Sequence, residues 1–123
     1  MKDTIIWEIF FTDNKGDDDT DDLAFFKGTL DEAVRYAKAL ILAHVRSEED
    51  PGDIEYVSFN DLCYDGEVGT IQRKNSHRTF WVKRHLRHSI VTIEDIDSEG
   101  EKLLEKFPNG IDEENKEDFL QIV

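Results

Sequence analysis

The stretch Thr70–His88, TIQRKNSHRTFWVKRHLRH, contains both the main strand signal and the main basic segment of this chain. It holds six of the 15 Lys and Arg residues and three of the 4 His residues, and it has no Asp or Glu. Asn75–His77 is a polar turn signal within it, and runs that flank such a turn are typical of a β-hairpin. We therefore expect strands at Val68–Lys74 and Arg78–His85.

Side chains alternate between the two faces of a strand, and this alternation predicts what the hairpin buries. Phe80 and Val82 share one face, which we expect to lie in the core. Trp81 and Lys83 belong to the opposite face, where Trp81 would be flanked by cations. Near the turn we expect cations to face one another across the hairpin, with Arg73 and Lys74 opposite Arg78 or His77.

The cations around Trp81 form the first candidate binding site. Positive groups beside an aromatic ring suit a phosphate-bearing ring, because charge and stacking then act together. Trp and Arg also dominate the hot spots of protein interfaces. The candidate ligand- or partner-binding residues are Arg73, Arg78, Trp81, Lys83, Arg84 and Arg87. The alternative is internal: these cations neutralise the chain's own acids, and a helix covers Trp81.

The segments before the hairpin predict a strand, a short pairing segment and a helix. Thr4–Thr12 is β-branched and aromatic, and nearly every position is apolar, so we expect a central strand with both faces covered. Leu23–Lys27 is a short apolar run that can pair back onto it. Leu30–Arg46 has apolar residues three and four apart, which predicts an amphipathic helix. Thr29 and Glu32 form a capping box at its start.

The remaining segments complete the predicted fold. Ile54–Phe59 and Ser89–Ile96 predict further strands on either side of the hairpin. Ser98 and Glu101 form a second capping box, and the short helix that follows should end near Phe107. The tail predicts one more short helix. The chain therefore predicts a single α+β domain over residues 1–123, with one mainly antiparallel sheet of about five strands, one long helix packed on one face and short C-terminal helices.

The acids form three clusters, and the densest is Asp13–Asp22, with six aspartates in ten residues. This composition predicts a solvated loop. Its alternating aspartates resemble the first ligands of a calcium loop, but Asp22 stands where Gly is needed and Gly28 where Glu is needed. We therefore assign no metal site to it. The other clusters are Glu48–Asp53 and Asp112–Asp118. The candidate partner-facing acids are Asp13, Asp17, Asp18, Asp19, Asp21 and Asp22.

The histidines raise the question of a metal site. His85 and His88 are three residues apart, and His77 is expected across the hairpin from them. Imidazoles at that spacing can share a metal, but no Cys or carboxylate stands beside them at a known ligand spacing. The alternative is a polar turn whose charge changes near neutral pH. His44 falls on the apolar face of the predicted helix, and we expect it at the edge of the core.

The net charge of −14 limits the partners of this chain. Such a chain is repelled by duplex DNA and by anionic membranes, and it is attracted to basic protein surfaces. No apolar run approaches the roughly 20 residues that span a bilayer. Charged residues interrupt the N-terminal apolar run where a signal peptide needs continuity. The single Cys63 forms no intramolecular disulfide. These features predict a cytoplasmic protein.

The usual catalytic signatures are missing from the sequence, which has no Gly-x-Ser-x-Gly elbow, phosphate loop or His-Glu-x-x-His motif. We therefore expect no enzymatic activity and no cofactor. In composition alone, the chain is similar to the broad class of phage or mobile-element inhibitors and toxin-immunity proteins. The leading hypothesis is a small acidic inhibitor or modulator that docks on a basic protein surface, with acids that imitate a nucleic-acid backbone.

Other functions stay open at this point. The alternative is a module that binds a nucleotide or another small phosphorylated anion through the basic-aromatic strip 73–88. A third hypothesis is a metal-assisted hydrolase that uses the aspartates or the histidines. An exposed strand of the predicted meander would also allow a homodimer.

Overall fold

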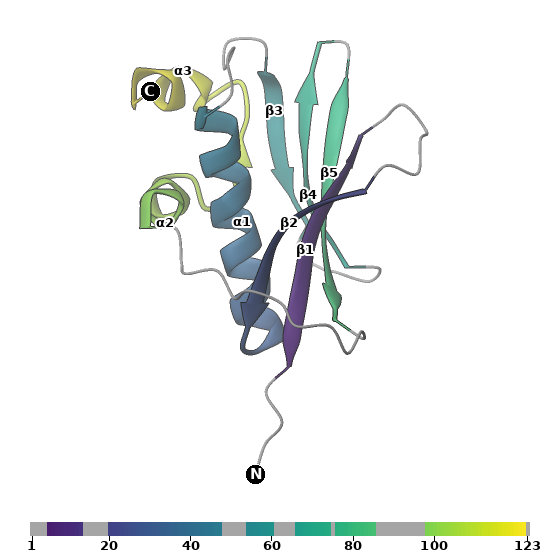
Figure 1. The fold of residues 1–123 in the computed structure, drawn as a ribbon. Coiled ribbons are helices and arrows are strands. Elements are labelled where there is room, and N and C mark those ends of the chain that lie inside the picture. Colours follow the sequence, from purple (N-terminus) through teal and green to yellow (C-terminus); the bar gives the residue numbers. More distant parts are fainter. Residues whose placement is uncertain are drawn as a thin grey trace.

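The computed structural model describes residues 5–13, 20–47, 54–60, 66–74, 76–85 and 98–122. Its elements form layers: a sheet, then the long helix α1, then the short helices α2 and α3 on the far side of α1 (Figure 1). The elements are β1 (Ile6–Asp13), β2 (Thr20–Lys27), α1 (Leu30–Ser47), β3 (Ile54–Phe59), β4 (Glu67–Arg73), β5 (His77–Arg84), α2 (Ser98–Lys106), β6 (Gly110–Ile111) and α3 (Lys116–Ile122).

The described strands form one sheet in the order β2-β1-β5-β4-β3-β6, and every neighbouring pair is antiparallel. The predicted α+β class with an antiparallel sheet is confirmed. The sheet has six strands rather than about five, because Gly110–Ile111 adds β6 beside β3. The predicted strand Ser89–Ile96 lies outside the described residues.

β1 is an internal strand between β2 and β5, as the sequence predicted. Ile9 and Phe11 are buried, whereas Glu8, Phe10 and Thr12 alternate with them on the opposite face and are only partly buried. The described helices all lie on one side of the sheet (Figure 1). The sequence predicted that both faces of this strand would be covered. This prediction is confirmed only for the face toward α1.

The β4–β5 hairpin forms where it was predicted, but its turn has a different register. Gln72 pairs with His77, and the Arg73 amide donates to the Ser76 carbonyl at 2.7 Å. The predicted pairing of Arg73 with Arg78 or His77 is therefore wrong. The Gln72 side chain stabilises this turn, because its amide donates to the carbonyls of Arg73 at 2.7 Å and Ser76 at 3.2 Å.

α1 begins at the predicted capping box. The Thr29 amide donates to Glu32 Oε1 at 3.1 Å, and the Glu32 amide donates to Thr29 Oγ1 at 3.2 Å. These bonds satisfy two amides that would otherwise lack partners at the helix start. Hydrogen bonds from the backbone and the hydroxyl of Thr29 lower the pKa of Glu32 below its ordinary value.

Although α1 is long, no helix among the described residues is apolar enough to cross a membrane.

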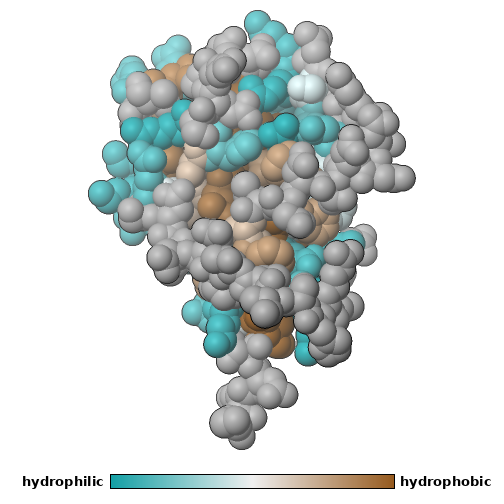
Figure 2. Space-filling model, in the orientation of Figure 1, coloured by the Kyte–Doolittle hydropathy of each residue, from teal (hydrophilic) through white to brown (hydrophobic). Residues whose placement is uncertain are grey.

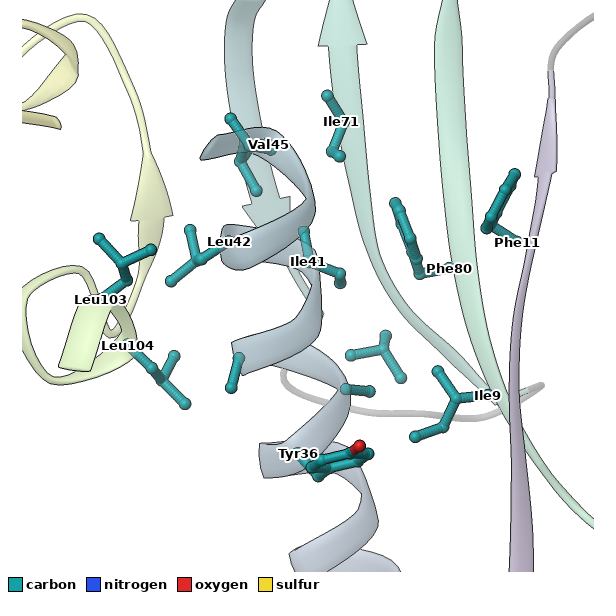
Figure 3. Close-up of a cluster of buried hydrophobic side chains, with 14 of the residues drawn as sticks. Ile9, Phe11, Tyr36, Ile41, Leu42, Val45, Ile71, Phe80, Leu103 and Leu104 are labelled. Carbon is teal, nitrogen blue, oxygen red and sulfur yellow. The ribbon is translucent and has the colours of Figure 1, made fainter. Parts of the chain in front are cut away.

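The core lies between the sheet and α1, and it continues from α1 to α2 (Figure 3). Ile41 lies on the strand side of α1, where Phe80 of β5 is fully buried. Leu42 points the other way, toward Leu103 and Leu104 of α2. α1 is thus covered on two sides, and the burial of its apolar surface is the main stabilising contribution to the fold.

α2 approaches α1 most closely at Gly100. A Cβ added to Gly100 would lie 2.3 Å from the carbonyl oxygen of Ala39 and 2.8 Å from its carbonyl carbon. Two surface ion pairs also join the helices, Arg35 with Glu101 and Arg46 with Glu99. Because exposed ion pairs contribute little, the close steric fit holds α2 on α1 more firmly than these charges do.

The C-terminal segment is anchored by a glycine turn and an aromatic contact. Gly110 has φ of +93°, and a Cβ there would lie 2.1 Å from the Val57 carbonyl oxygen, so only glycine fits at the start of β6. The Asp112 side chain accepts backbone amides of the turn that precedes α3. Phe119 of α3 then packs edge-on against Phe107, with ring centroids 5.5 Å apart. Both predicted C-terminal helices are therefore present.

Candidate functional site

Aromatic rings and charged groups meet on the face of the sheet opposite α1, over β1, β2 and β5. The strand register places them there, because Glu8 lies opposite both Phe25 and Lys83, and Phe10 lies opposite Trp81. Directly opposed residues of antiparallel strands share a face. This outer-face cluster consists of Glu8, Phe10, Phe25, Trp81, Lys83 and His85.

Trp81 is half-buried in this cluster and held from several sides. Its ring stacks with Phe10, with centroids 6.4 Å apart and planes inclined by 13°. Its indole N–H donates to Thr12 Oγ1 at 3.1 Å. Lys83 Nζ lies 5.8 Å from the centroid of Phe10 and 5.9 Å from that of Trp81. The cation is thus shared by two ring faces, an arrangement that attracts it electrostatically and positions it beside the indole.

His85 and Glu8 form the polar end of the outer-face cluster. His85 Nδ1 lies 2.5 Å from Glu8 Oε1, and the His85 side chain is only 5% exposed. Its ring meets Phe25 edge-on, with centroids 5.5 Å apart. A carboxylate on one ring nitrogen fixes the orientation of an imidazole. Glu8 and Phe25 therefore determine how this histidine is held.

Two of the three histidines that were considered for a metal site lie far apart. His77 is the first residue of β5 and His85 directly follows its last residue, and a strand of this length spans about 25 Å. His77 therefore lies too far from His85 to share an ion with it, while His88 lies outside the described residues. Among the residues that the structure describes, no group of His, Cys, Asp and Glu side chains could hold a metal.

Arg78 lies on the helix-side face of β5, away from Trp81. Its Nε is 2.7 Å from Asp13 Oδ1 and its Nη2 is 3.3 Å from Oδ2, which makes a two-point ion pair. Its guanidinium carbon sits 4.1 Å from the Phe11 ring centroid. Its Nη1 is 2.8 Å from His44 Nε2. Because Arg cannot accept a hydrogen bond, the His44 nitrogen must accept this one.

His44 lies at the edge of the core, as the sequence predicted. Its ring packs against Phe11 and Phe80, with centroids 5.7 Å away in each case. Arg78 therefore contributes to an internal arrangement of charge and rings at this end of the sheet. This pairing matches the internal alternative that the sequence left open for the basic strip.

The predicted binding residues are divided between the two faces of the sheet. Trp81 and Lys83 share the outer face, whereas Arg78 and Arg84 lie opposite Asp13 and Trp7 in the register, on the helix side. Arg73 lies at the end of β4, opposite Ile54, and Arg87 lies outside the described residues. Alternation along β5 separates cations that are adjacent in sequence, so the structure does not bring the six residues together.

The Asp-rich segment is not a loop throughout. Asp13 is the last residue of β1, and Asp21 and Asp22 belong to β2, where their backbones pair with β1. The loop prediction is therefore wrong for these three residues, because pairing with β5 extends β1 to Asp13 and pairing with β1 extends β2 beyond its apolar part. Asp17, Asp18 and Asp19 lie outside the described residues.

The C-terminal helices carry the larger described acidic surface. Residues 98–122 contain eight carboxylates and three lysines. Figure 2 shows hydrophilic residues at the upper left of the molecule, where Figure 1 places α2 and α3. Among the described residues, no ion pair involves six of the exposed acids of this segment, whereas Glu99 and Glu101 pair with Arg46 and Arg35. These six acids, the acidic helical layer, are Glu105, Asp112, Glu113, Glu114, Glu117 and Asp118.

Sequence reasoning missed the β1 and β2 members of the outer-face cluster. Glu8 and Thr12 are polar and in phase with Phe10, which indicates a partly exposed face of β1. That signal was present in the sequence but was outweighed by the number of apolar residues in the run. Phe25 gave no comparable signal. It joins the cluster because β2 pairs with β1 and β1 pairs with β5, and β1 is distant from β5 in sequence.

Comparison of the chain with protein-family models, with curated proteins and with solved structures found no match in any of the three.

Proposed function

We propose that this chain is a small acidic, non-enzymatic binding protein that docks on a basic protein surface as an inhibitor or modulator. The observation that supports the proposal is the acidic helical layer, in which six carboxylates are exposed and have no ion pair among the described residues. A surface of one charge sign accelerates encounter with a partner of the opposite sign and makes binding sensitive to salt.

The acidic helical layer is a better docking surface than the described part of the Asp-rich segment. Asp13 is already engaged by Arg78, so part of its charge is satisfied within the chain. The acids of α3 and its preceding turn instead stand on a segment anchored by Phe107 and Phe119. Charges on a packed segment are positioned before binding, which lowers the entropy cost of association.

The finer form of the proposal concerns the kind of partner. Carboxylates repeated over a short helix and turn can take the place of the phosphates of a nucleic-acid backbone. The partner that we favour is therefore a basic, nucleic-acid-binding protein. Such a role fits the phage, mobile-element or immunity-like character proposed from composition, and a cytoplasmic location.

A pull-down from a lysate of the native host, followed by mass spectrometry, tests the proposal. The test variant neutralises three acids of the layer: Glu113→Gln, Glu117→Gln and Asp118→Asn. The control variant neutralises three carboxylates elsewhere: Asp31→Asn, Glu55→Gln and Glu67→Gln. Both variants have the same net charge, so a basic protein retained by the control and lost by the test variant would place the contact on the layer.

The isolated partner then allows a quantitative check. Affinity should fall as salt rises, because screening weakens the attraction between opposite charges. Equal binding by the two variants, or an affinity that does not change with salt, would contradict the proposal.

A second candidate function is binding of a nucleotide or another phosphorylated ligand at the outer-face cluster. The observation that favours it is Lys83, which lies over the rings of both Phe10 and Trp81. Titration with a nucleotide panel should quench tryptophan fluorescence, and Trp81→Ala should abolish the change while Trp7 still fluoresces. A panel without quenching would exclude this candidate.

A further inference from the structure

β2 is an edge strand whose outer side has no strand partner among the described residues. The Gly28 amide donates to the Ile5 carbonyl at 3.2 Å, so these two residues form a bonded pair between β2 and β1. Bonded and non-bonded pairs alternate along an antiparallel ladder. Phe26 therefore turns its backbone groups toward β1, whereas Phe25 and Lys27 turn theirs away from the sheet.

The opposite side of β1 supports this assignment. The His85 amide donates to the Ile6 carbonyl at 2.8 Å, so Ile6 directs its backbone groups toward β5. Ile6 lies opposite Lys27 in the β1–β2 register. Lys27 accordingly has no bonded partner in β1, and no other described strand lies beside its backbone groups at the edge.

The edge strand carries opposite charges near its two ends. β2 reads TDDLAFFK, with two aspartates near its start and one lysine at its end. An antiparallel copy of the strand brings the Lys27 end of one chain beside the aspartate end of the other. A parallel copy would place like charges together, which is unfavourable.

We propose that two copies of this chain associate by antiparallel pairing of β2 with β2, around a two-fold axis at Phe25. In this register Phe25 faces its own copy, and both residues direct their backbone groups across the edge. Lys27 faces Leu23 of the second copy, next to Asp22. Opposed aromatic residues stabilise a strand pair, and the pairing joins the two outer-face clusters across the axis.

The β2 bulge limits the strength of this association. The register with β1 shifts between Ile9 and Phe10, which leaves Leu23 as the extra residue of the bulge, so the pair between Lys27 and Leu23 of the second copy lies at the limit of the regular segment Ala24–Lys27. The paired segment is short, and the dimer is accordingly weak and reversible. Both copies also carry a large negative charge, so salt should strengthen the dimer by screening their repulsion. Docking on a basic partner should weaken with salt, which distinguishes the two associations.

Sedimentation velocity over a concentration series tests the pairing through the Lys27 amide. Lys27→Pro removes this outward-facing N–H, and a proline is tolerated at an edge position whose N–H faces away from the sheet. Lys27→Ala keeps the N–H and serves as the matched control. We expect the wild type and Lys27→Ala to dimerise, and Lys27→Pro to raise the dissociation constant about tenfold or more, because each dimer loses two hydrogen bonds.

A wild type that stays monomeric at every concentration and salt level would overturn the proposal. So would equal dimerisation of Lys27→Pro and Lys27→Ala. Melting curves recorded at a dilute, monomeric concentration show whether Lys27→Pro has kept its fold.

Disulfide cross-linking in a Cys63→Ser background provides a test that does not depend on the proline variant. Phe25→Cys should cross-link under oxidation, because opposed residues of a bonded pair have Cα atoms about 5.5 Å apart. Lys27→Cys should not, because the two copies of residue 27 are four strand positions apart, or about 13 Å. Failure of Phe25→Cys to cross-link, or equal cross-linking by Lys27→Cys, would refute the register at Phe25.

Discussion

Gly100→Ala should weaken the contact between α2 and α1, and with it the attachment of the acidic helical layer. The added Cβ would lie 2.3 Å from the Ala39 carbonyl oxygen and 2.8 Å from the carbonyl carbon. Both are backbone atoms, so no side-chain rotation relieves the overlap and α2 must move away from α1. Leu103 and Leu104, which are 3% and 4% exposed, would move with it.

The size of the effect follows from two opposing contributions. Overpacking of a close contact costs about 1–3 kcal/mol. The better helix propensity of Ala offsets less than about 1 kcal/mol of this. A net loss of about 1–2 kcal/mol should lower the melting temperature of a domain of this size by roughly 3–10 °C.

Urea titration and thermal melts followed by circular dichroism measure this loss directly. Glu105→Ala, on an exposed position of the same helix, is the control and should change the free energy of unfolding by less than about 0.5 kcal/mol. Ala39→Gly should not rescue Gly100→Ala, because the carbonyl group that causes the overlap remains. A fully stable Gly100→Ala, or rescue by Ala39→Gly, would show that the reasoning is wrong.

Four further predictions concern the capping box, the Arg78 pair and the core. Thr29→Ala should cost about 0.5–2 kcal/mol in urea titration, because α1 loses its cap. Since folding lowers the pKa of Glu32, its ionisation adds stability that is present above its ordinary pKa of 4.5 and lost as pH falls through the lowered value. The stability difference between wild type and Glu32→Gln should therefore shrink in acid, and a constant difference would contradict this. Asp13→Asn should cost about 1 kcal/mol or less, because its pair with Arg78 is partly exposed, and a larger loss would show a buried role. Phe80→Ala should cost about 3–5 kcal/mol in the same titration, because the ring is fully buried, and a loss near zero would contradict its place in the core.

The elements that could be predicted are those whose signals are local. The capping box at Thr29 and the apolar spacing of Leu30–Arg46 lie within one segment, and the helix forms there. The hairpin was predicted from one turn and two flanking runs. β6 was not, because Gly110–Ile111 becomes a strand only by pairing with β3.

The candidate site could be predicted only in part, for a related reason. Alternation correctly separated Phe80 from Trp81, since both belong to one strand. The contacts of Trp81 with Phe10 and Thr12 come from β1, and no pattern within β5 indicates that β1 is its neighbour. The contact of Phe25 with this cluster could not be predicted for the same reason.

By itself, the sequence determined the α+β class, the apolar face of α1 and the assignment of Phe80 and Trp81 to opposite faces of β5. Residue periodicity is enough for these, because it sets which side chains point the same way along one element. Only the tertiary structure decided which charges meet. Arg78 is 65 residues from Asp13 in sequence and contacts it because β1 and β5 are neighbours in the sheet. Pairing between distant segments depends on how the whole core packs, and it is this pairing that brought Asp13 to Arg78 and Phe10 to Trp81.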